Sequence, residues 1–341
     1  MTINKDKIKK ILLITLSNIG DVVLTLPVYG ALKKEFPQAK ITVLVGTSAK
    51  DLFCCEPSVE EVIVNKKRAS FAETLDMVLD LRKRKFDLIV DLKNTLYPLI
   101  LGAKYHTSIF SLKREDSFPR REKHLARISS LGIRVDNISL PILYSDEDKD
   151  AVLQLLEKEG VNLGQPIIAV AAGAKSHIKR WPSENFTKFC KMITDKGLAQ
   201  VVLIGDTSDI PITDSIMKAG IKGFFNLTGA TNLRELIFLI SLCKVLITND
   251  SAPLHIGSML NIPVVAIFGP TDERKYGPTS ERSVVVKDDI KCRPCETALC
   301  RYDLECMKNI LPEEVFALLE KIFGNYRFGR KFFPPRKNTK Y

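Results

Sequence analysis

Two segments of the sequence place a carboxylate directly after an apolar run and before a helix-like stretch. The first carries Asp21 after Ile11–Leu16, and the second carries Asp250 after Val245–Ile247. In open α/β sheets the turns at the carboxyl ends of the strands meet where ligands bind, and helix N-termini attract anions. The two segments together therefore predict acid–base chemistry on a phosphorylated substrate.

In the first segment, Gly20 permits a tight turn and Asp21 falls at the first turn of the next helix. Asp21 has two interpretations: a general base, or an ordinary helix N-cap, for which Asp is a preferred residue. The segment contains neither Gly-x-Gly-x-x-Gly nor Gly-Lys-Ser/Thr. This argues against dinucleotide binding and against P-loop chemistry.

The second segment opens a helix with hydroxyl and small side chains. Asp250 is followed by Ser251 and Ala252, and His255 lies one turn further on. Small residues let phosphate oxygens approach the partially positive amides at a helix start. We therefore interpret this helix start as an anion site. His255 can face the same side as Ser251 or can be a hydrogen-bonded packing histidine.

A third segment carries three cations after the expected strand Ile167–Ala171. Lys175, Lys179 and Arg180 at this edge could neutralise a diphosphate without a metal ion, or they could form a solvated basic loop. Trp181, which precedes a proline, indicates that the loop is held in place.

Apolar periodicity predicts the elements that position these segments. In the first half we expect strands at Ile11–Leu16, Ile41–Val45, Glu61–Val64, Leu88–Leu92 and Ser108–Leu112, and helices at Val22–Phe36, Phe71–Arg84, Arg121–Leu131 and Glu147–Glu159. In the second half we expect strands at Ile167–Ala171, Val201–Ile204, Val245–Ile247 and Val264–Phe268, and helices at Glu184–Lys196, Asp209–Ala219, Asn232–Leu242, Ser251–Leu260 and Pro312–Phe323.

This alternation predicts two α/β domains with mostly parallel sheets. We place the domains at residues 1–155 and 156–325, with a basic and aromatic tail at 326–341. With both sheets facing a shared cleft, the Asp21 and Asp250 segments would meet there.

The formal net charge of +11 favours anionic partners. Basic residues gather in the segment 113–127, which includes Arg120 and Arg121, and in the tail. The tail suits either a lipid-headgroup surface or a solvated terminus. No apolar run is long enough to cross a membrane, and the N-terminus lacks a secretory cleavage pattern, so we expect a cytoplasmic protein.

The three segments together resemble glycosyltransferase family 9, the lipopolysaccharide heptosyltransferases. The string Ser17–Pro27 is similar to the family's N-terminal signature, and Lys179-Arg-Trp-Pro182 resembles its central Lys-x-Trp-Pro. Thr248–His255 and Pro263–Asp272 resemble the C-terminal signature. The resemblance extends over roughly residues 10 to 323, nearly the whole chain.

The resemblance implies a GT-B fold, with two Rossmann-like domains facing across a cleft, the acceptor in the first and the nucleotide-sugar in the second. It implies an inverting transfer of heptose from ADP-heptose to a lipopolysaccharide core acceptor, without a metal or other cofactor. For a cytoplasmic enzyme of this kind, the basic tail could contact the surface of the inner membrane or nothing.

By position, the resemblance makes Asp21 the base that deprotonates the acceptor hydroxyl, next to Gly20. Donor roles fall on Lys179 for the diphosphate, Asp250 for sugar hydroxyls, Ser251 and Ala252 for phosphate, His255 for support of that turn, and Asp209 near the nucleoside. The family often has Thr-Gly where this chain has Ser251-Ala252, which adds a methyl group near the diphosphate. We further expect Arg120 and Arg121 to meet anionic groups of the acceptor.

Four of the eight cysteines form the pattern Cys292-x2-Cys295-x4-Cys300-x5-Cys306. A cytoplasmic location disfavours disulfides. Structural zinc and reduced or redox-variable thiols both remain open at this stage.

Two alternatives to a heptosyltransferase also remain open. The same fold could use another nucleotide-sugar or another acceptor. A non-catalytic module that binds nucleotides or nucleic acid would suit the basic pI, but no nucleic-acid-binding motif accompanies the basic residues.

Overall fold

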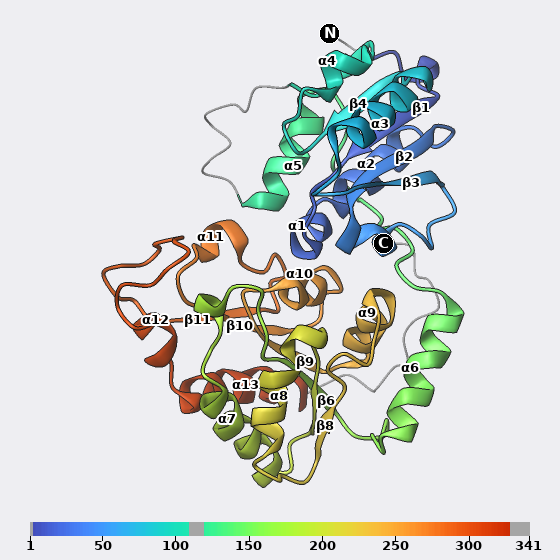
Figure 1. Ribbon diagram of the computed structural model, residues 1–341. Helices are drawn as coiled ribbons and strands as arrows, with labels where there is room; N and C mark the ends of the chain where they lie inside the picture. Colours follow the sequence, from blue (N-terminus) through green and yellow to red (C-terminus); the bar gives the residue numbers. More distant parts are fainter. Residues whose placement is uncertain (1–2, 109–118, 328–341) are drawn as a thin grey trace. The chain divides into compact units, whose positions relative to one another are not determined.

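The computed structural model describes residues 3–108 and 119–327, which form two compact units (Figure 1). The chain divides between Leu143 and Tyr144, upstream of the predicted boundary at 155. The reason is that the helix beginning at Asp146 packs on the second unit. There Asp148 Oδ2 forms an ion pair with Arg234 Nε, 3.0 Å away.

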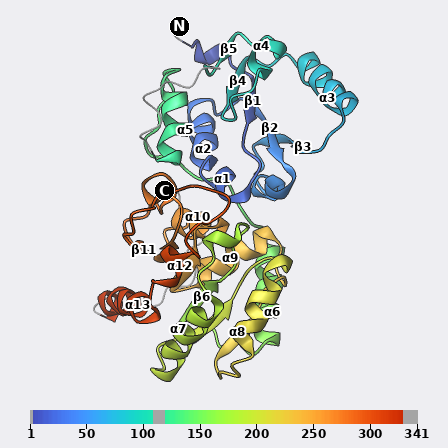
Figure 2. The same ribbon diagram turned by 60° about the vertical axis from the view of Figure 1, so that its left-hand side comes forward.

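The first unit is a five-stranded parallel sheet in the order β3-β2-β1-β4-β5. Its strands are β1 Lys10–Ile14, β2 Lys40–Gly46, β3 Val59–Asn65, β4 Leu88–Asp91 and β5 Tyr105–His106. Its helices are α1 Ile19–Val23, α2 Leu26–Glu35, α3 Phe71–Lys83, α4 Tyr97–Leu101 and α5 Arg120–Ser129, with 3-10 turns at Lys5–Lys7 and Thr47–Leu52. Figure 2 shows α2 and α5 on one side of this sheet and α3 on the other.

The second unit is a six-stranded parallel sheet in the order β11-β10-β9-β6-β7-β8. Its strands are β6 Ile167–Ala171, β7 Gln200–Leu203, β8 Phe224–Asn226, β9 Val245–Asn249, β10 Val264–Phe268 and β11 Val284–Lys287. Its helices are α6 Asp146–Lys158, α7 Ser183–Asp195, α8 Ile210–Met217, α9 Leu233–Leu242, α10 Ala252–Met259, α11 Glu273–Tyr276, α12 Glu305–Lys308 and α13 Pro312–Arg327, with 3-10 turns at His177–Lys179 and Thr207–Asp209.

Most predicted elements lie within a residue or two of those observed. The predicted single helix Val22–Phe36 is wrong: it is split into α1 and α2 around Thr25, because Pro27 has no N–H and restricts the residue before it. The expected strand Ser108–Leu112 falls mostly outside the described residues, and the edge strand beside β4 is β5. The apolar pattern does not predict the short edge strands β8 and β11.

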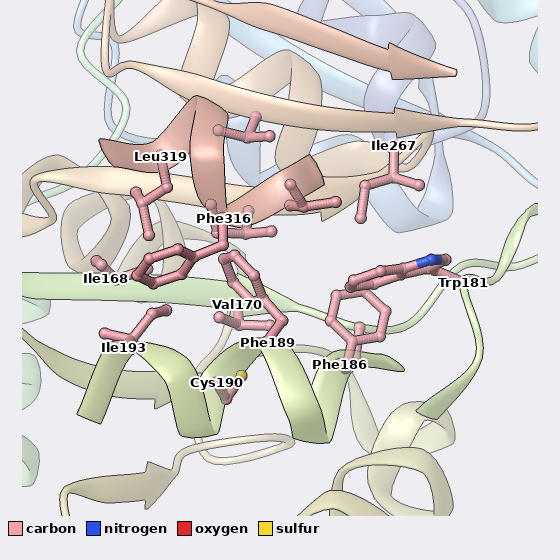
Figure 3. Packing of buried hydrophobic residues seen from close by; sticks show 14 of the residues in the cluster. Ile168, Val170, Trp181, Phe186, Phe189, Cys190, Ile193, Ile267, Phe316 and Leu319 are labelled. Carbon is pink, nitrogen blue, oxygen red and sulfur yellow. The ribbon is translucent and has the colours of Figure 1, made fainter. Parts of the chain in front are cut away.

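The core of the second unit anchors the loop that follows β6 (Figure 3). Trp181 is fully buried and meets Phe186 edge-on, with 4.8 Å between ring centroids. Its indole Nε1 donates to the Ile310 carbonyl over 2.9 Å. An aromatic ring of this size, buried with its N–H satisfied, fixes the backbone on either side of it. The expectation that Trp181 marks a fixed loop is confirmed.

Both sheets have the Rossmann strand order: the first three strands add outward on one side, and the chain then crosses back so that the fourth strand lies on the other side of the first. The reversal lies between β1 and β4 in the first unit and between β6 and β9 in the second. Ligands of such sheets bind outside the carboxyl ends of the strands at this point. The loops after these four strands are therefore the places to look for a site in each unit.

Candidate functional site

In the second unit the reversal point brings Lys179 and Asp250 together, although they are far apart in the sequence. Lys179 Nζ lies 2.7 Å from Asp250 Oδ2. The side chain of Asp250 is 5% exposed and that of Lys179 is 28% exposed. The cation can therefore be reached from solvent, while the carboxylate that holds it is buried.

Thr271 is the second partner of this carboxylate. Its hydroxyl Oγ1 donates to Asp250 Oδ2 over 2.7 Å, from the turn that follows β10. The sequence alone assigns Thr271 no role, although it lies in the string that resembles the C-terminal family signature. A hydroxyl after a strand end is a weak signal unless the neighbouring strand is known.

Asn249 ties the same region together, and the sequence alone does not single it out either. Its side-chain amide donates to the Ala172 carbonyl over 2.8 Å and accepts from the Trp181 amide over 3.1 Å. Asn249 thus joins the end of β9 to the loop that carries Lys179. This link explains how Lys179 is held beside Asp250.

The start of α10 has the geometry expected of an anion site within the second unit. Ser251 is the N-cap residue, with extended backbone and no hydrogen bond from its side chain to the helix amides. Pro253 has no N–H, and the Leu254 amide donates to the Ser251 carbonyl over 3.1 Å. The amides of Ser251 and Ala252 are therefore those that a ligand could reach. His255 is buried one turn further on.

The other two cations of the loop after β6 are Arg180 and Lys175. Arg180 Nε donates to the Ala174 carbonyl over 2.7 Å, which folds the loop back on itself. Lys175 is exposed. Of the three cations that the sequence groups, Lys179 thus contacts the Asp250 carboxylate, whereas Arg180 contacts the backbone of its own loop.

Asp209 fits between two glycines at the carboxyl ends of β6 and β7. A Cβ on Gly173 would collide with the Asp209 carboxyl, and a Cβ on Gly205 would lie 2.7 Å from its Oδ2. Burial raises the pKa of the Asp209 carboxyl above its usual range; Asp206 adds to this through its charge, and Arg180 opposes it. Gly205 precedes Asp209 in the same loop, but the sequence alone cannot place Gly173, from the loop after β6, against this carboxylate.

In the first unit, Asp21 lies in the first turn of α1 after β1 and is half-buried. The N-cap residue is Asn18, so the N-cap interpretation of Asp21 is wrong. Asn18 Nδ2 donates to Asp21 Oδ2 over 3.0 Å. Gly20 is the second residue of α1 rather than part of the turn before it. The loop before α1 passes so close to the backbone of Gly46 that a Cβ there would collide with Ser17.

The basic helix α5 begins with Arg120 and Arg121, and Arg121 lies 3.8 Å from Glu122. His124 is buried on the same helix, and neither ring nitrogen has a hydrogen-bond partner among the residues that the structure describes. Burial, reinforced by Arg120, Arg127 and Lys123, lowers the pKa of His124 to about 4. The imidazole is neutral at physiological pH. Lys113 and Arg114 of the same basic segment lie outside the described residues, as does the tail after residue 327.

The cysteine segment supports the turn that carries Thr271. Arg293 is almost fully buried and donates to the carbonyls of Gly269 and Thr271. The amides of Cys295 and Glu296 donate to Pro270, each over 3.0 Å. This segment therefore braces the residue that contacts Asp250.

The four cysteines of this segment are free thiols. Burial raises the pKa of the Cys306 thiol to about 11, with Cys292 and Cys300 nearby. Over residues 3–108 and 119–327 the structure contains no group of three or more His, Cys, Asp or Glu side chains arranged to hold a metal ion. In the same residues no helix is both long and apolar enough to cross a membrane.

Comparison with known proteins decides the family. The sequence profile of glycosyltransferase family 9 (heptosyltransferase) matches residues 74–305, more than half of the chain. The chain belongs to glycosyltransferase family 9. It is a glycosyltransferase of the heptosyltransferase family, as the resemblance implied.

Curated relatives of this family 9 enzyme align over most of their length. Lipooligosaccharide heptosyltransferase 2 of Haemophilus influenzae is 28% identical, covering 81% of this chain and 88% of the relative. Lipopolysaccharide heptosyltransferase 2 of Escherichia coli K12 is 27% identical, covering 82% and 88%.

Solved structures of the family share the fold. The E. coli ADP-heptose LPS heptosyltransferase II superposes with a TM-score of 0.75 and 25% identity, covering 93% of this chain and 99% of that one. A family 9 glycosyltransferase from Veillonella parvula superposes with a TM-score of 0.83 and 20% identity, covering 95% and 99%. The predicted α/β class with two Rossmann-like parallel sheets, the GT-B fold, is confirmed.

Proposed function

We propose that this family 9 enzyme is an inverting, metal-independent heptosyltransferase that moves a heptose from ADP-heptose to a lipopolysaccharide core acceptor. The observation that carries the proposal is the Lys179–Asp250 pair at the reversal point of the second sheet, beside the amides of Ser251 and Ala252. The names of the relatives supply the donor and the acceptor: the E. coli structure is that of an ADP-heptose enzyme, and both curated relatives are heptosyltransferases of lipopolysaccharide or lipooligosaccharide.

In this proposal the second unit holds the donor. Lys179 and the two amides offset the charge that develops on the diphosphate as the glycosidic bond to phosphate breaks. Asp250, fixed by Thr271, accepts hydrogen bonds from sugar hydroxyls, and the buried His255 supports the turn. Asp209 contacts the nucleoside near Gly173.

The first unit holds the acceptor. Its hydroxyl oxygen attacks the anomeric carbon from the side opposite the diphosphate, while Asp21 takes the hydroxyl proton. One carboxylate suffices, because the leaving group departs as a stabilised anion and needs no proton. A retaining glycosidase would instead need two carboxyl groups roughly 5 Å apart. Arg120 and Arg121 on α5 bind anionic groups of the acceptor core.

A donor-panel assay with the purified chain tests this function. We expect transfer from ADP-heptose to a heptose-acceptor core saccharide, with inversion at the anomeric carbon shown by NMR and with activity retained in excess EDTA. Transfer from UDP-glucose but not from ADP-heptose would replace the proposed donor. Retention of configuration, or loss of activity in EDTA that is restored by a divalent ion, would contradict the proposed mechanism.

A further inference from the structure

The first unit exposes six large apolar side chains on and beside two short stretches of helix. They are Phe71, Leu75 and Leu79 on α3 and Leu96, Leu99 and Ile100 at α4, and we call them the α3–α4 patch. Their exposed fractions run from 42% at Ile100 to 85% at Phe71. Single exposed apolar residues are ordinary, but a group of this size marks an interaction surface.

The two helices that carry the patch contact each other through their inner faces. Met77, Val78 and Leu81 of α3 share one apolar cluster with Tyr97 and Leu101 of α4. The patch is therefore built on a packed support. It does not consist of separate side chains on mobile loops.

The helix α3 is divided lengthwise into apolar and acidic sectors. Phe71, Leu75 and Leu79 follow one another at intervals of four residues, so they form a stripe along one side. At 100° per residue, Glu73 and Asp80 fall on the side of α3 away from this stripe, and Asp76 lies at its edge, three residues before Leu79. Two of these three acids are thus kept away from the apolar stripe.

Basic residues flank the two helices of the patch in the sequence, and one of them, Lys66, forms an ion pair of 3.2 Å with Glu73. Lys66, Lys67 and Arg68 stand immediately before α3, and Lys93 and Lys104 stand before and after α4. All five are exposed. Lysine is depleted in protein–protein interfaces, whereas apolar stripes flanked by Lys and Arg are typical of helices that lie in the headgroup region of anionic membranes.

We infer that the α3–α4 patch docks this enzyme on the surface of an anionic lipid bilayer. The apolar stripe enters the boundary between headgroups and acyl chains, and the flanking basic residues meet anionic headgroups. The inference goes beyond the proposed function and does not depend on it. For a lipid-linked acceptor, such docking would hold the first unit at the surface that presents the acceptor.

Vesicle co-sedimentation of the full chain tests the inference. The vesicles contain phosphatidylethanolamine with about a quarter phosphatidylglycerol, and no acceptor, so the outcome is independent of the glycosyltransferase reaction. We expect the variant Leu75→Ser/Leu79→Ser/Leu99→Ser to lower the partition coefficient by about tenfold or more. The matched control Leu153→Ser/Leu163→Ser replaces exposed leucines of the second unit and should bind as the wild type does.

A charge variant tests whether the flanking basic residues contact anionic headgroups. Lys67→Glu/Arg68→Glu should weaken binding to these vesicles by several-fold and leave the already weaker binding to pure phosphatidylcholine unchanged. Circular dichroism and unchanged ADP binding show that each variant is folded. If the triple variant does not fold, the single variant Phe71→Ser replaces it in the vesicle assay. Equal partitioning of wild type and patch variants would overturn the inference and place membrane binding elsewhere. A wild-type dimer that the triple variant dissociates, without vesicle binding by either, would overturn it in favour of a second copy of the chain.

Discussion

Asp21 and Asp250 each follow a strand that borders the reversal point of its sheet: Asp21 follows β1, the first strand of its unit, and Asp250 follows β9, the fourth strand of its unit. Their surroundings differ. Asp250 is buried and its Oδ2 is held by Lys179 and Thr271, whereas Asp21 is half-buried and accepts from Asn18 on the same turn. A carboxylate fixed by two partners from other loops suits ligand binding. A carboxylate with a local partner and access to solvent suits proton transfer.

The largest effect on stability should come from removing a partner of the buried Asp250 carboxylate. Lys179→Ala removes the cation that pairs with the buried Asp250 carboxylate and leaves the hydrogen bond from Thr271. Because a buried charge then lacks its counter-ion, we expect the unfolding free energy of the second unit to fall by about 3 kcal/mol. Urea denaturation measures this loss. Lys175→Ala removes an exposed cation from the same loop and is the control. A similar small loss for both variants would show that Lys179 is not needed to hold Asp250.

The next largest effect on stability should come from filling the space that Gly173 leaves beside the Asp209 carboxyl. In Gly173→Ala the new methyl group displaces the Asp209 carboxyl, which should destabilise the second unit by about 2 kcal/mol and weaken ADP binding. The double variant Gly173→Ala/Asp209→Ala should regain stability but not ADP affinity, as calorimetry would show. If the double variant is no more stable than the single one, the collision is not the cause.

The buried His124 of the first unit should make the stability of the protein depend on pH. Its pKa falls from 6.5 to about 4 on folding, so the unfolded chain binds more protons between these values and stability decreases as the pH falls. Between about pH 7 and pH 5 we expect a loss of about 2 kcal/mol that is absent in His124→Leu. Urea denaturation at both pH values measures it, with His177→Gln as the control. The same pH dependence in His124→Leu would assign the loss to other groups.

The smallest effect should come from Thr271→Val, which keeps the shape of the side chain and removes its hydroxyl. We expect a loss of about 1 kcal/mol and a modest rise in the Kd for the donor. Thr271→Ser retains the hydroxyl and should restore both. Full activity and stability in Thr271→Val would show that Lys179 alone fixes the carboxylate.

The strand–turn–helix units around Asp21 and Asp250 could be predicted because apolar runs and their spacing are local properties of the sequence. The Lys179–Asp250 pair could not, because it depends on β6 and β9 being neighbours in the sheet. The positions of Thr271 and Asn249 depend on the same strand order. The break at Thr25 was readable from Pro27, but the apolar periodicity continues through it and predicts a single helix. Asp209 lies against Gly173 because β6 and β7 are side by side, which the sequence alone does not show.

The roles assigned to the two carboxylates are tested most directly by comparing Asp21→Asn with Asp250→Asn in one series. For each we would measure the transfer rate at saturating substrates and the Kd for ADP-heptose. We predict that Asp21→Asn lowers the transfer rate by about 10² to 10⁴ and leaves the Kd within about twofold, because a general base acts only on the proton. Asp250→Asn should mainly raise the Kd. Transfer by Asp21→Asn at the wild-type rate would contradict the assignment of Asp21 as the base.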